Sequence, residues 1–534
     1  MKNHSQRVII LGASVAGICL ANEMAMAGHQ VLLFSQRTLG VAPQALGQSV
    51  FRASLSKKDQ DQHFLDSVRF AGFLGNHIKI RELCQSSASY LQYLQALGLE
   101  LKAANSSLGL NGFYEFNEQR AYQLLLQQLR CHQASHRVRV LEHWRPLALA
   151  NTEQGVAGVV AENAASMEIE AFSAEAVVCA EGFAQSLFFS QSSFQNDGFL
   201  LSCLKEGASL QGAEFIAFHP LTASSQVGSS YLSLDVLNQK AGRLFLQKNN
   251  GERFYFLEDW YSDWQDLPDF LISRAMAKVQ ATAKTGESIF LEQGDQQIPV
   301  RPGFKHFLGG LATDDAHQTD LSGLYAIGFA SNALFGAGCL PSNAFALQMQ
   351  TGLDLANQLM QKTHWGGDSS LSAKQFLPAL KDDQKRRVQD LLELSGPENL
   401  SALKRELSEL CHFALGPMRD NAVLQKFATR CEALKEKASR LGLHDQSEHA
   451  NQELARARDL FTALELAPAL SMAAEKRDES RGVHYKIGFY EPRDDLFLQD
   501  SCITLKQGRY DYQLKNLQHA IVKPKRRQRL EVAG

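Results

Sequence analysis

A run of small residues near the middle of the chain, LFGAGCLPSNAF at 334–345, is of a type that lets a backbone approach a flat or bulky molecule. Gly336 and Gly338 carry no side chain that would keep such a molecule away. Ser342 and Asn343 then have the residue types that begin helices, and the N-terminal amides of a helix stabilise nearby negative charge. The alternative is an ordinary turn before a capped helix with nothing bound.

The N-terminal residues have the pattern of a dinucleotide-binding turn. The apolar run RVIIL at 7–11 predicts a buried parallel strand, and GASVAG follows at once and opens into a helix. Gly12 permits the tight turn, Gly17 allows close packing of the helix on the strand, and Ser14 takes the middle position that is often glycine. The helix amides then offer a site for a pyrophosphate. The candidate cofactor-binding residues of this turn are Gly12, Ser14, Val15, Ala16 and Gly17.

The second predicted strand, QVLLFS at 30–35, has an unusual end for an NAD-binding protein. Ser35, Gln36 and Arg37 stand where an acidic residue usually holds a ribose hydroxyl. The pattern therefore predicts a dinucleotide in general more securely than NAD. A structural glycine turn in an α/β protein that binds no nucleotide is the alternative.

The composition of the chain narrows its function classes. Its 534 residues are 45% hydrophobic with a net charge of -3, which favours two to four globular domains and gives no reason to expect a nucleic acid as partner. The nine cysteines form no CxxC pair and no Cys/His metal spacing, so we expect reduced thiols in a cytoplasmic compartment and no metal. We also expect no signal peptide and no transmembrane segment.

Several further motifs, taken in order, resemble those of one flavoprotein family. EFIAFHP at 214–220 resembles E-F-x-Q-F-H-P-T, and GLYAIGFASNALFGAGCLPSNAF at 323–345 resembles G-L-Y-A-x-G-E followed by G-A-N-R-L-x-S-N-S-L. SRGVHY at 480–485 resembles S-R-G-A-H-Y, and RDD at 493–495 matches R-D-D. Over nearly its whole length the chain resembles the flavoproteins succinate dehydrogenase, fumarate reductase and L-aspartate oxidase. The resemblance implies FAD as the cofactor.

The resemblance also implies where the FAD would lie. Many family members end the second strand in Ser-Lys, so the end of this strand fits the family. The glycine-rich segment is expected to pass beside the flavin, and the helix that begins at Ser342 and Asn343 is expected to face the pyrimidine carbonyls of its ring. The remaining cofactor-binding residues that the resemblance implies are Ser35, Gln36, Arg37, Ala180, Gly328, Gly336, Gly338, Ser342 and Asn343.

Three departures concern the cofactor. The family's glutamate after G-L-Y-A-x-G is Phe329 here, and its A-T-G-G strand end reads AEGF with Glu181. No histidine lies between Leu39 and Asp61, where respiratory members attach FAD, and His63 falls inside the next predicted helix. We therefore expect FAD to be bound non-covalently.

The substrate positions depart further from the family. Asp269 stands at the arginine of the P-R-D motif, Lys305 at the histidine of H-Y-x-x-G-G, His306 at its tyrosine, and Cys339 at the arginine of G-A-N-R-L. Of the substrate constellation, only His219 clearly persists. An arginine holds a carboxylate with a fork of donors, which a cysteine lacks. We therefore expect a small-molecule substrate that is not a simple dicarboxylate.

Each candidate catalytic residue also has a plainer interpretation. His219 could act as an acid, a base or a hydrogen-bonding group, or be a satisfied core histidine. Lys305 and His306 could form an anion site or a proton carrier, but the lysine could simply face solvent. Cys339 could be reactive, or be a small buried thiol. Asp269 could act as a base or bind a cation, or be an exposed helix N-cap.

The predicted fold class is α/β, with a Rossmann-like FAD-binding domain, an inserted capping domain and a C-terminal helical domain. The FAD-binding domain is expected at 1–213 and again at 306–363, on either side of a capping domain at 214–305. Helical apolar spacing then predicts a helical domain at 370–475, and 476–534 is expected to form a tail that packs back on the body.

Three hypotheses of function follow from these patterns. The favoured one is an FAD-dependent oxidoreductase that transfers a hydride between a small molecule and the flavin. The others are a flavoprotein subunit that needs an electron-accepting partner protein, and a non-catalytic scaffold that has lost FAD. The basic run KPKRRQR at 523–529 is expected to be a solvated terminus, with docking to an acidic partner or anionic lipid as its alternative.

Overall fold

The computed structural model describes residues 5–40, 48–104, 112–188, 197–225, 228–238, 241–331, 334–368, 370–517 and 519–524. Most of the basic run at 523–529 therefore lies outside the described residues.

A seven-stranded sheet forms the centre of the predicted nucleotide-binding domain. Its strands follow the order β6-β2-β1-β9-β8-β7, and β18 also pairs with β9. Strands β6, β2, β1, β9 and β18 are parallel, whereas β8 and β7 are antiparallel. Parallel strands with both faces covered read as continuous apolar runs, and RVIIL is such a run. The bounds are β1 Ser5–Leu11, β2 Val31–Ser35, β6 Val138–Glu142, β7 Trp144–Thr152, β8 Gly155–Asn163, β9 Ile169–Cys179 and β18 Leu324–Ala326.

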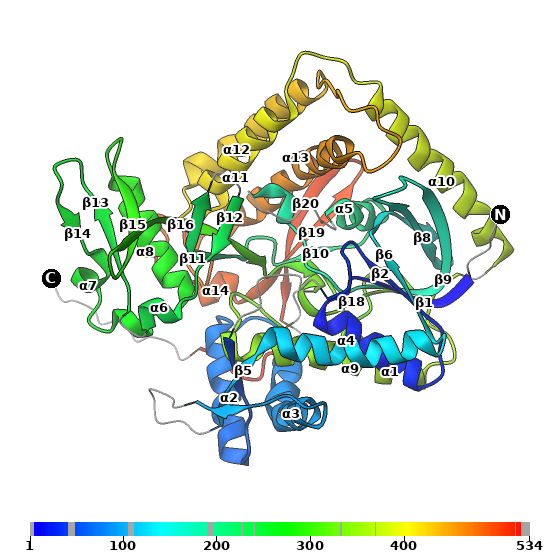
Figure 1. Cartoon of the computed structure of the whole chain (residues 1–534), viewed down its shortest axis with the longest axis horizontal. Coiled ribbons are helices and arrows are strands. Elements are labelled where there is room, and N and C mark those ends of the chain that lie inside the picture. The colour runs from blue at the N-terminus through cyan, green and yellow to red at the C-terminus, as the bar shows by residue number, and fades with distance from the viewer. Residues whose placement is uncertain are drawn as a thin grey trace.

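Helices α1, α4 and α9 run beside this sheet (Figure 1). The first and last of them pack very closely, because a Cβ atom added at Gly352 would lie 2.4 Å from the carbonyl oxygen of Ala16. Two further helices and a small sheet of order β3-β5-β4 lie next to them. The bounds are α1 Val15–Met26, α2 Lys57–Phe70, α3 His77–Ala96, α4 Glu118–Ala134, α9 Ala344–Gln361, β3 Gln48–Arg52, β4 Lys102–Ala103 and β5 Phe113–Asn117.

The capping segment forms its own sheet and core. Its six strands follow the order β12-β11-β16-β15-β13-β14, and it projects to one side of the molecule (Figure 1). Helix α8 packs against β11, and apolar residues such as Leu244, Met276 and Leu291 are buried between the elements. The bounds are β11 Ile216–Ser225, β12 Gly228–Tyr231, α6 Asp235–Asn238, β13 Arg243–Gln247, β14 Arg253–Phe254, α7 Phe256–Trp260, α8 Asp269–Thr282, β15 Ser288–Gln293 and β16 Gln296–Phe307.

The C-terminal part begins with four long helices, as the helical apolar spacing indicates. Helices α11, α12 and α13 pack on one another, and α10 crosses strands β7, β8 and β9. The bounds are α10 Leu371–Leu392, α11 Leu400–Leu415, α12 Asn421–Ala438 and α13 Gln452–Lys476.

The residues after α13 return to the body of the protein. Hairpin β19-β20 joins the short strands β10 and β17 in a sheet of order β17-β10-β19-β20. No helix among the described residues is long and apolar enough to cross a lipid bilayer. The remaining bounds are α5 Asp197–Lys205, β10 Leu210–Gln211, β17 Gly310–Leu311, α14 Asp494–Phe497, β19 Gln499–Lys506 and β20 Arg509–Asn516, with short 3-10 helices η1 Gln185–Leu187, η2 Trp264–Asp266, η3 Gly328–Ala330 and η4 Pro341–Asn343.

Candidate active site

The predicted nucleotide turn lies between β1 and α1. Gly12 has a φ of +122°, which L side chains rarely adopt, so glycine is required there. Ser14 occupies the N-cap position, where its hydroxyl accepts a hydrogen bond from the amide of Gly17 at 3.2 Å and donates one to the carbonyl of Ala180 at 2.5 Å. Ser14 thereby joins the start of α1 to the end of β9, at the carboxyl ends of the parallel strands where ligands of such sheets bind.

Close packing explains the other glycines around this turn. A Cβ atom at Gly17 would lie 2.1 Å from the carbonyl oxygen of Gly12, and one at Gly328 would lie 3.0 Å from the Cβ atom of Ala16. The amide of Gly328 donates a hydrogen bond to Thr351 in α9. The ends of β1, β9 and β18 and the starts of α1 and α9 are therefore held close together.

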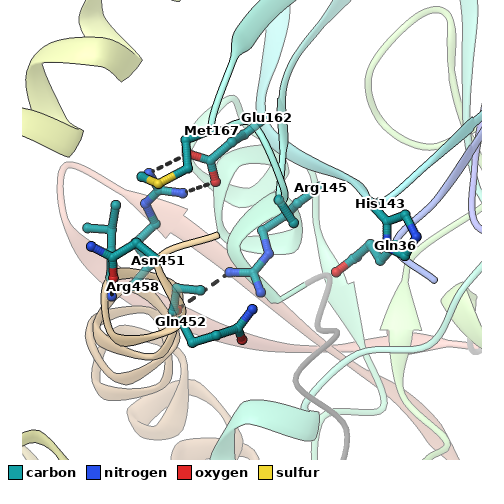
Figure 2. A pocket seen from close by; sticks show the side chains of 11 residues that line it. Gln36, His143, Arg145, Glu162, Met167, Asn451, Gln452 and Arg458 are labelled. Atoms are coloured by element: carbon teal, nitrogen blue, oxygen red, sulfur yellow. Dashed lines mark hydrogen bonds and ion pairs between the residues drawn. The ribbon is translucent and has the colours of Figure 1, made fainter. Parts of the chain in front are cut away.

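The residues after β2 are turned toward the helical domain. Ser35 donates a hydrogen bond from its hydroxyl to the carbonyl of Arg37 at 2.7 Å, which forms a tight local turn. Gln36 is buried and lines a pocket with residues from β7, β8 and α13 (Figure 2). At this pocket Arg458 of α13 forms a double ion pair with Glu162 of β8. This ion pair therefore links α13 to the central sheet, close to the end of β2.

The glycines of segment 334–338 lie against protein backbone. A Cβ atom at Gly336 would lie 2.8 Å from the carbonyl oxygen of Ala71, and one at Gly338 would lie 2.7 Å from that of Phe70. Both contacts are with the C-terminal end of α2 and the turn after it. The absence of side chains thus lets this segment approach α2, a reason for the small residues that the sequence pattern alone did not reveal.

The start of α9 carries no side-chain cap. Asn343 is buried at the N-cap position, but its Oδ1 atom lies 2.7 Å from Nε2 of His63 and its Nδ2 atom donates to Ser67 at 2.8 Å. Nδ1 of His63 lies 2.9 Å from the hydroxyl of Ser54. The side chain of Asn343 therefore does not cap α9, and the amide of Ala344 donates to the carbonyl of Pro341 in the 3-10 helix η4, which leads directly into α9.

His63 and Ser67 belong to this arrangement although no sequence motif marks them. Burial lowers the pKa of His63 to about 4, so the imidazole is neutral near pH 7 and Nε2–H can donate to Asn343. His63 lies within α2, as predicted, and both of its ring nitrogens have partners. The two residues fix the side chain of Asn343.

Five predicted catalytic residues meet where the capping segment contacts the nucleotide-binding domain. Residues His219 on β11 and Lys305 and His306 on β16 lie on paired strands, whose register shifts once between Ala217 and Phe218 and again after His219. The first shift falls at Lys305, because Ala217 pairs with His306 and Phe218 pairs with Phe304. Such bulges redirect side chains, often next to active sites.

An ion pair forms the centre of this cluster. Nζ of Lys305 lies 2.6 Å from Oδ2 of Asp269, and their side chains are 27% and 14% exposed. Burial opposes the charge of Asp269, but Lys305 outweighs it and holds the pKa of this carboxyl below its ordinary value. Asp269 is the first residue of α8, with Pro268 at the N-cap position. Asp269 is therefore not an exposed N-cap residue, and the side chain of Lys305 is ion-paired while it stays partly exposed to solvent.

The two histidines of the cluster are neutral near pH 7. Burial, aided by the charge of Lys305, lowers the pKa of His219 to about 4 and that of His306 to about 3. Within the described structure Nδ1 of His219 is buried and forms no hydrogen bond of ordinary geometry, and the backbone of Leu221 interacts with the ring. Its ring lies 5.1 Å from the ring of Tyr231, between centroids. A buried nitrogen without a partner is a candidate for contact with a ligand.

Cys339 lies beside the same ion pair and remains a thiol. Burial raises its pKa to about 12, while Lys305 and Asp269 act on it in opposite directions. Its Sγ atom donates to the carbonyl of Leu340 at 3.4 Å. A thiol with so high a pKa is a weak nucleophile, so the geometry favours a space-filling role for Cys339.

A buried ionic network holds the C-terminal segment against both domains. Arg477 forms ion pairs with Glu214, which lies just before β11, and with Glu479, and all three side chains are fully buried. Arg481 pairs with Glu479 at 2.8 Å and donates to the carbonyl of Gly72 at 2.7 Å. The network thus reaches the turn after α2, against which the glycine segment packs.

The arginine of α8 also contacts this C-terminal segment. Arg274 donates to the carbonyl of Gly482 at 3.0 Å, and its guanidinium carbon lies 4.2 Å from the ring centroid of Tyr485. Arg274 therefore links the cap to SRGVHY and does not replace the arginine that is absent at Asp269.

Comparisons with known proteins agree with this architecture. The chain matches a model of the FAD binding domain over residues 7–295 and one of the fumarate reductase flavoprotein C-term over 404–529. It is 26% identical to the succinate dehydrogenase flavoprotein subunit of Bacillus subtilis, with 92% of each chain covered. It is 24% identical to the fumarate reductase flavoprotein subunit of Mycobacterium tuberculosis, with 68% of this chain and 69% of the relative covered.

A solved structure of E. coli quinol fumarate reductase shares the fold, with a TM-score of 0.85, 20% identity, and 98% of this chain and 99% of that chain covered. The predicted fold class and FAD as cofactor are thereby confirmed, and the turn of Gly12 at the start of α1 fits the negatively charged phosphates of a dinucleotide. The chain belongs to the FAD-dependent oxidoreductases of the succinate dehydrogenase and fumarate reductase flavoprotein family.

Proposed function

We propose that the protein transfers a hydride between non-covalently bound FAD and a small molecule that is not a simple dicarboxylate. The observation that carries this proposal is the ion pair of Lys305 with Asp269, at 2.6 Å, where the family resemblance leads one to expect an arginine and a histidine. FAD supplies the hydride acceptor or donor, and the residues of the chain bind and orient the substrate.

The charges of the cluster do not suit a dicarboxylate. Lys305 and Asp269 act with opposite sign on His219, His306 and Cys339, so their charges largely cancel at those positions. Both histidines are neutral near pH 7, and Cys339 offers neither a charge nor a fork of donors. Two substrate carboxylates would lose their hydration without gaining cationic partners. A neutral or zwitterionic molecule fits this arrangement better.

The cluster supplies hydrogen-bonding and proton-carrying groups for such a molecule. The unpartnered Nδ1 of His219 can accept a hydrogen bond or a proton from a substrate hydroxyl, amine or acidic C–H group. Asp269 fixes the ammonium of Lys305, which retains N–H donors for a carbonyl or hydroxyl oxygen. In this scheme His219 is the proton carrier and Lys305 orients the substrate.

Non-covalent binding of FAD is supported by the surroundings of His63. This residue has partners at both ring nitrogens, Ser54 and Asn343, and is therefore unsuited to attack the flavin. Part of the stretch between Leu39 and Asp61, residues 41–47, lies outside the described structure, but it contains no histidine.

A partner protein that exchanges electrons with the FAD is also part of the proposal. The Bacillus subtilis relative is named as a flavoprotein subunit, and the chain covers 92% of its length. All nine cysteines are free thiols, which supports a reducing, cytoplasmic compartment. Purification of the protein at low salt from its own cells, followed by identification of bound chains, tests for this partner.

The decisive experiment for the catalytic proposal is a visible absorption spectrum followed by anaerobic reduction. We expect flavin bands that pass through a filter after denaturation, and bleaching by a neutral or zwitterionic donor but not by succinate. Colour retained with the denatured chain would contradict non-covalent binding. Rapid bleaching by succinate, or reoxidation of the reduced protein by fumarate, would contradict the substrate class.

A further inference from the structure

The two residues at which the cofactor site departs from the family lie on adjacent strand ends. Strands β9 and β18 are parallel neighbours, with Cys179 opposite Ala326 at their carboxyl ends. A Cβ atom added at Gly182 would lie 3.2 Å from the Cβ atom of Phe329. Glu181 therefore comes from the segment that directly contacts the position where the family carries its glutamate.

The side chain of Glu181 extends over the nucleotide turn. Its Cγ and Cδ atoms lie 2.4 Å and 2.9 Å from where a Cβ atom on Gly12 would be. Burial raises the pKa of the Tyr122 hydroxyl, and the negative charge of Glu181 contributes to the rise. That hydroxyl donates to the carbonyl of Ala13 at 2.8 Å. The carboxylate of Glu181 thus lies at the turn between β1 and α1.

Phe329 takes part in an apolar stack instead. Its ring is parallel to that of Phe335, with centroids 4.7 Å apart and an interplanar angle of 6°, and its centroid lies 4.9 Å from that of His306. A phenyl ring offers no hydrogen-bond acceptor of the strength of a carboxylate. Position 329 therefore cannot hold a cofactor hydroxyl as a glutamate would.

We infer that Glu181 supplies the carboxylate that family members carry at the position of Phe329, and that it accepts a hydrogen bond from a hydroxyl of the FAD. The carboxylate has moved from the end of β18 to the end of the adjacent β9, and the vacated position has become part of the aromatic wall beside His306. This inference rests on FAD binding alone and is independent of the proposed substrate.

The cofactor carries groups that such an acceptor can bind. FAD carries several hydroxyl groups between its phosphates and its rings, and a hydroxyl that loses water on binding must find a new acceptor. Loss of a hydrogen bond to a charged acceptor typically weakens binding about 10- to 100-fold. The affinity for FAD therefore reports directly on Glu181.

The test measures the dissociation constant for FAD by fluorescence titration of protein from which the flavin has been removed. E181T installs the residue of the A-T-G-G strand end, and we expect its dissociation constant to rise about 10- to 100-fold. The double variant E181T/F329E returns the carboxylate to the end of β18, and we expect it to regain most of the lost affinity. The matched control E181T/F329L changes the same two positions without a carboxylate and should regain none.

Each outcome decides the inference. Unchanged or tighter binding of FAD by E181T would show that the carboxylate does not hold the cofactor and would overturn the proposal. If E181T/F329E bound FAD no more tightly than E181T/F329L, the inference that the carboxylate has moved from position 329 to position 181 would be overturned. Thermal melting of the FAD-free variants separates these results from misfolding, and E181Q, which keeps an acceptor oxygen, should bind more tightly than E181T.

Discussion

The ion pair of the cap junction and the ionic network of the C-terminal segment contain the same types of charge in very different settings. Lys305 and Asp269 remain 27% and 14% exposed, and they form an ion pair next to neutral histidines. Arg477, Glu214 and Glu479 are fully buried, and every nitrogen at the end of the Arg477 side chain donates to a carboxylate or a carbonyl. A saturated buried network fixes structure, whereas a partly exposed pair can change partners when a substrate enters.

The largest effect should come from breaking the network. Arg477→Met leaves the buried carboxylates of Glu214 and Glu479 without this partner, and we expect a loss of about 3–5 kcal/mol in the free energy of unfolding. Urea denaturation followed by circular dichroism measures this loss. Arg387→Met, which removes an exposed ion pair with Asp383, is the control and should cost less than about 1 kcal/mol. Equal losses in the two variants would contradict the comparison.

Breaking the ion pair between Lys305 and Asp269 should instead affect turnover. In Lys305→Met the carboxylate of Asp269 loses its partner and the substrate loses a donor, so we expect kcat/KM for the donor found by anaerobic reduction to fall about 100-fold. The dissociation constant for FAD should stay within about twofold, since a factor of two is only about 0.4 kcal/mol. Lys278→Met, on the exposed side of α8, is the matched control and should keep full activity. Normal turnover by Lys305→Met would remove this residue from the proposed site.

The free energy of unfolding should depend on pH through His219, which lies beside the ion pair of Lys305 and Asp269. Its pKa is lowered to about 4 in the folded protein from an ordinary value of about 6.5, so the unfolded chain takes up a proton first as the pH falls. The contribution of neutral His219 to the free energy of unfolding is therefore fully present above the unfolded pKa of about 6.5 and is lost as the pH falls toward 4. Between pH 7 and pH 5 this loss amounts to about 2 kcal/mol. His219→Asn should remove that part of the decrease in the thermal melting midpoint. An identical pH profile in the variant would show that His219 is not buried as a neutral group.

The smallest effect is expected at Arg274, through which the capping segment contacts the C-terminal segment. Arg274→Lys keeps the charge but loses the planar stack on Tyr485 and the geometry of the bond to Gly482, so we expect a loss of about 1 kcal/mol in the free energy of unfolding. Urea titration of the variant and the parent gives this difference. A loss as large as that of Arg477→Met would mean that Arg274 belongs to the network.

Much of the fold could be predicted because its motifs occur at strand ends and helix starts in a fixed order. RVIIL followed by GASVAG specifies a strand, a turn and a helix through local chemistry, and the structure has them as β1 and α1. Each candidate catalytic residue was likewise found from its position in a motif. Their protonation states and contacts could not be found in this way, because they depend on burial and on strand register.

Contacts between distant residues account for most of what the sequence did not reveal. Asn343 is held by His63, 280 positions earlier in the chain, and neither neighbourhood contains a pattern that indicates the pair. Gly336 and Gly338 were interpreted as neighbours of a flavin, and the structure adds a second reason for them, the close approach to α2. A residue type can satisfy two packing requirements at once, and a sequence pattern does not separate them.

The contact between Arg481 and Gly72 has a consequence for the order in which the protein matures on the ribosome. The turn at Gly72 is translated early, yet the guanidinium that holds it comes from a segment made some 400 residues later, and Glu214 similarly waits for Arg477. Strand β10 also lacks its neighbour β19 until that segment has emerged. The nascent chain therefore lacks these contacts throughout most of its synthesis, and the turn at Gly72 and strand β10 reach their final packing only after the C-terminal segment has emerged.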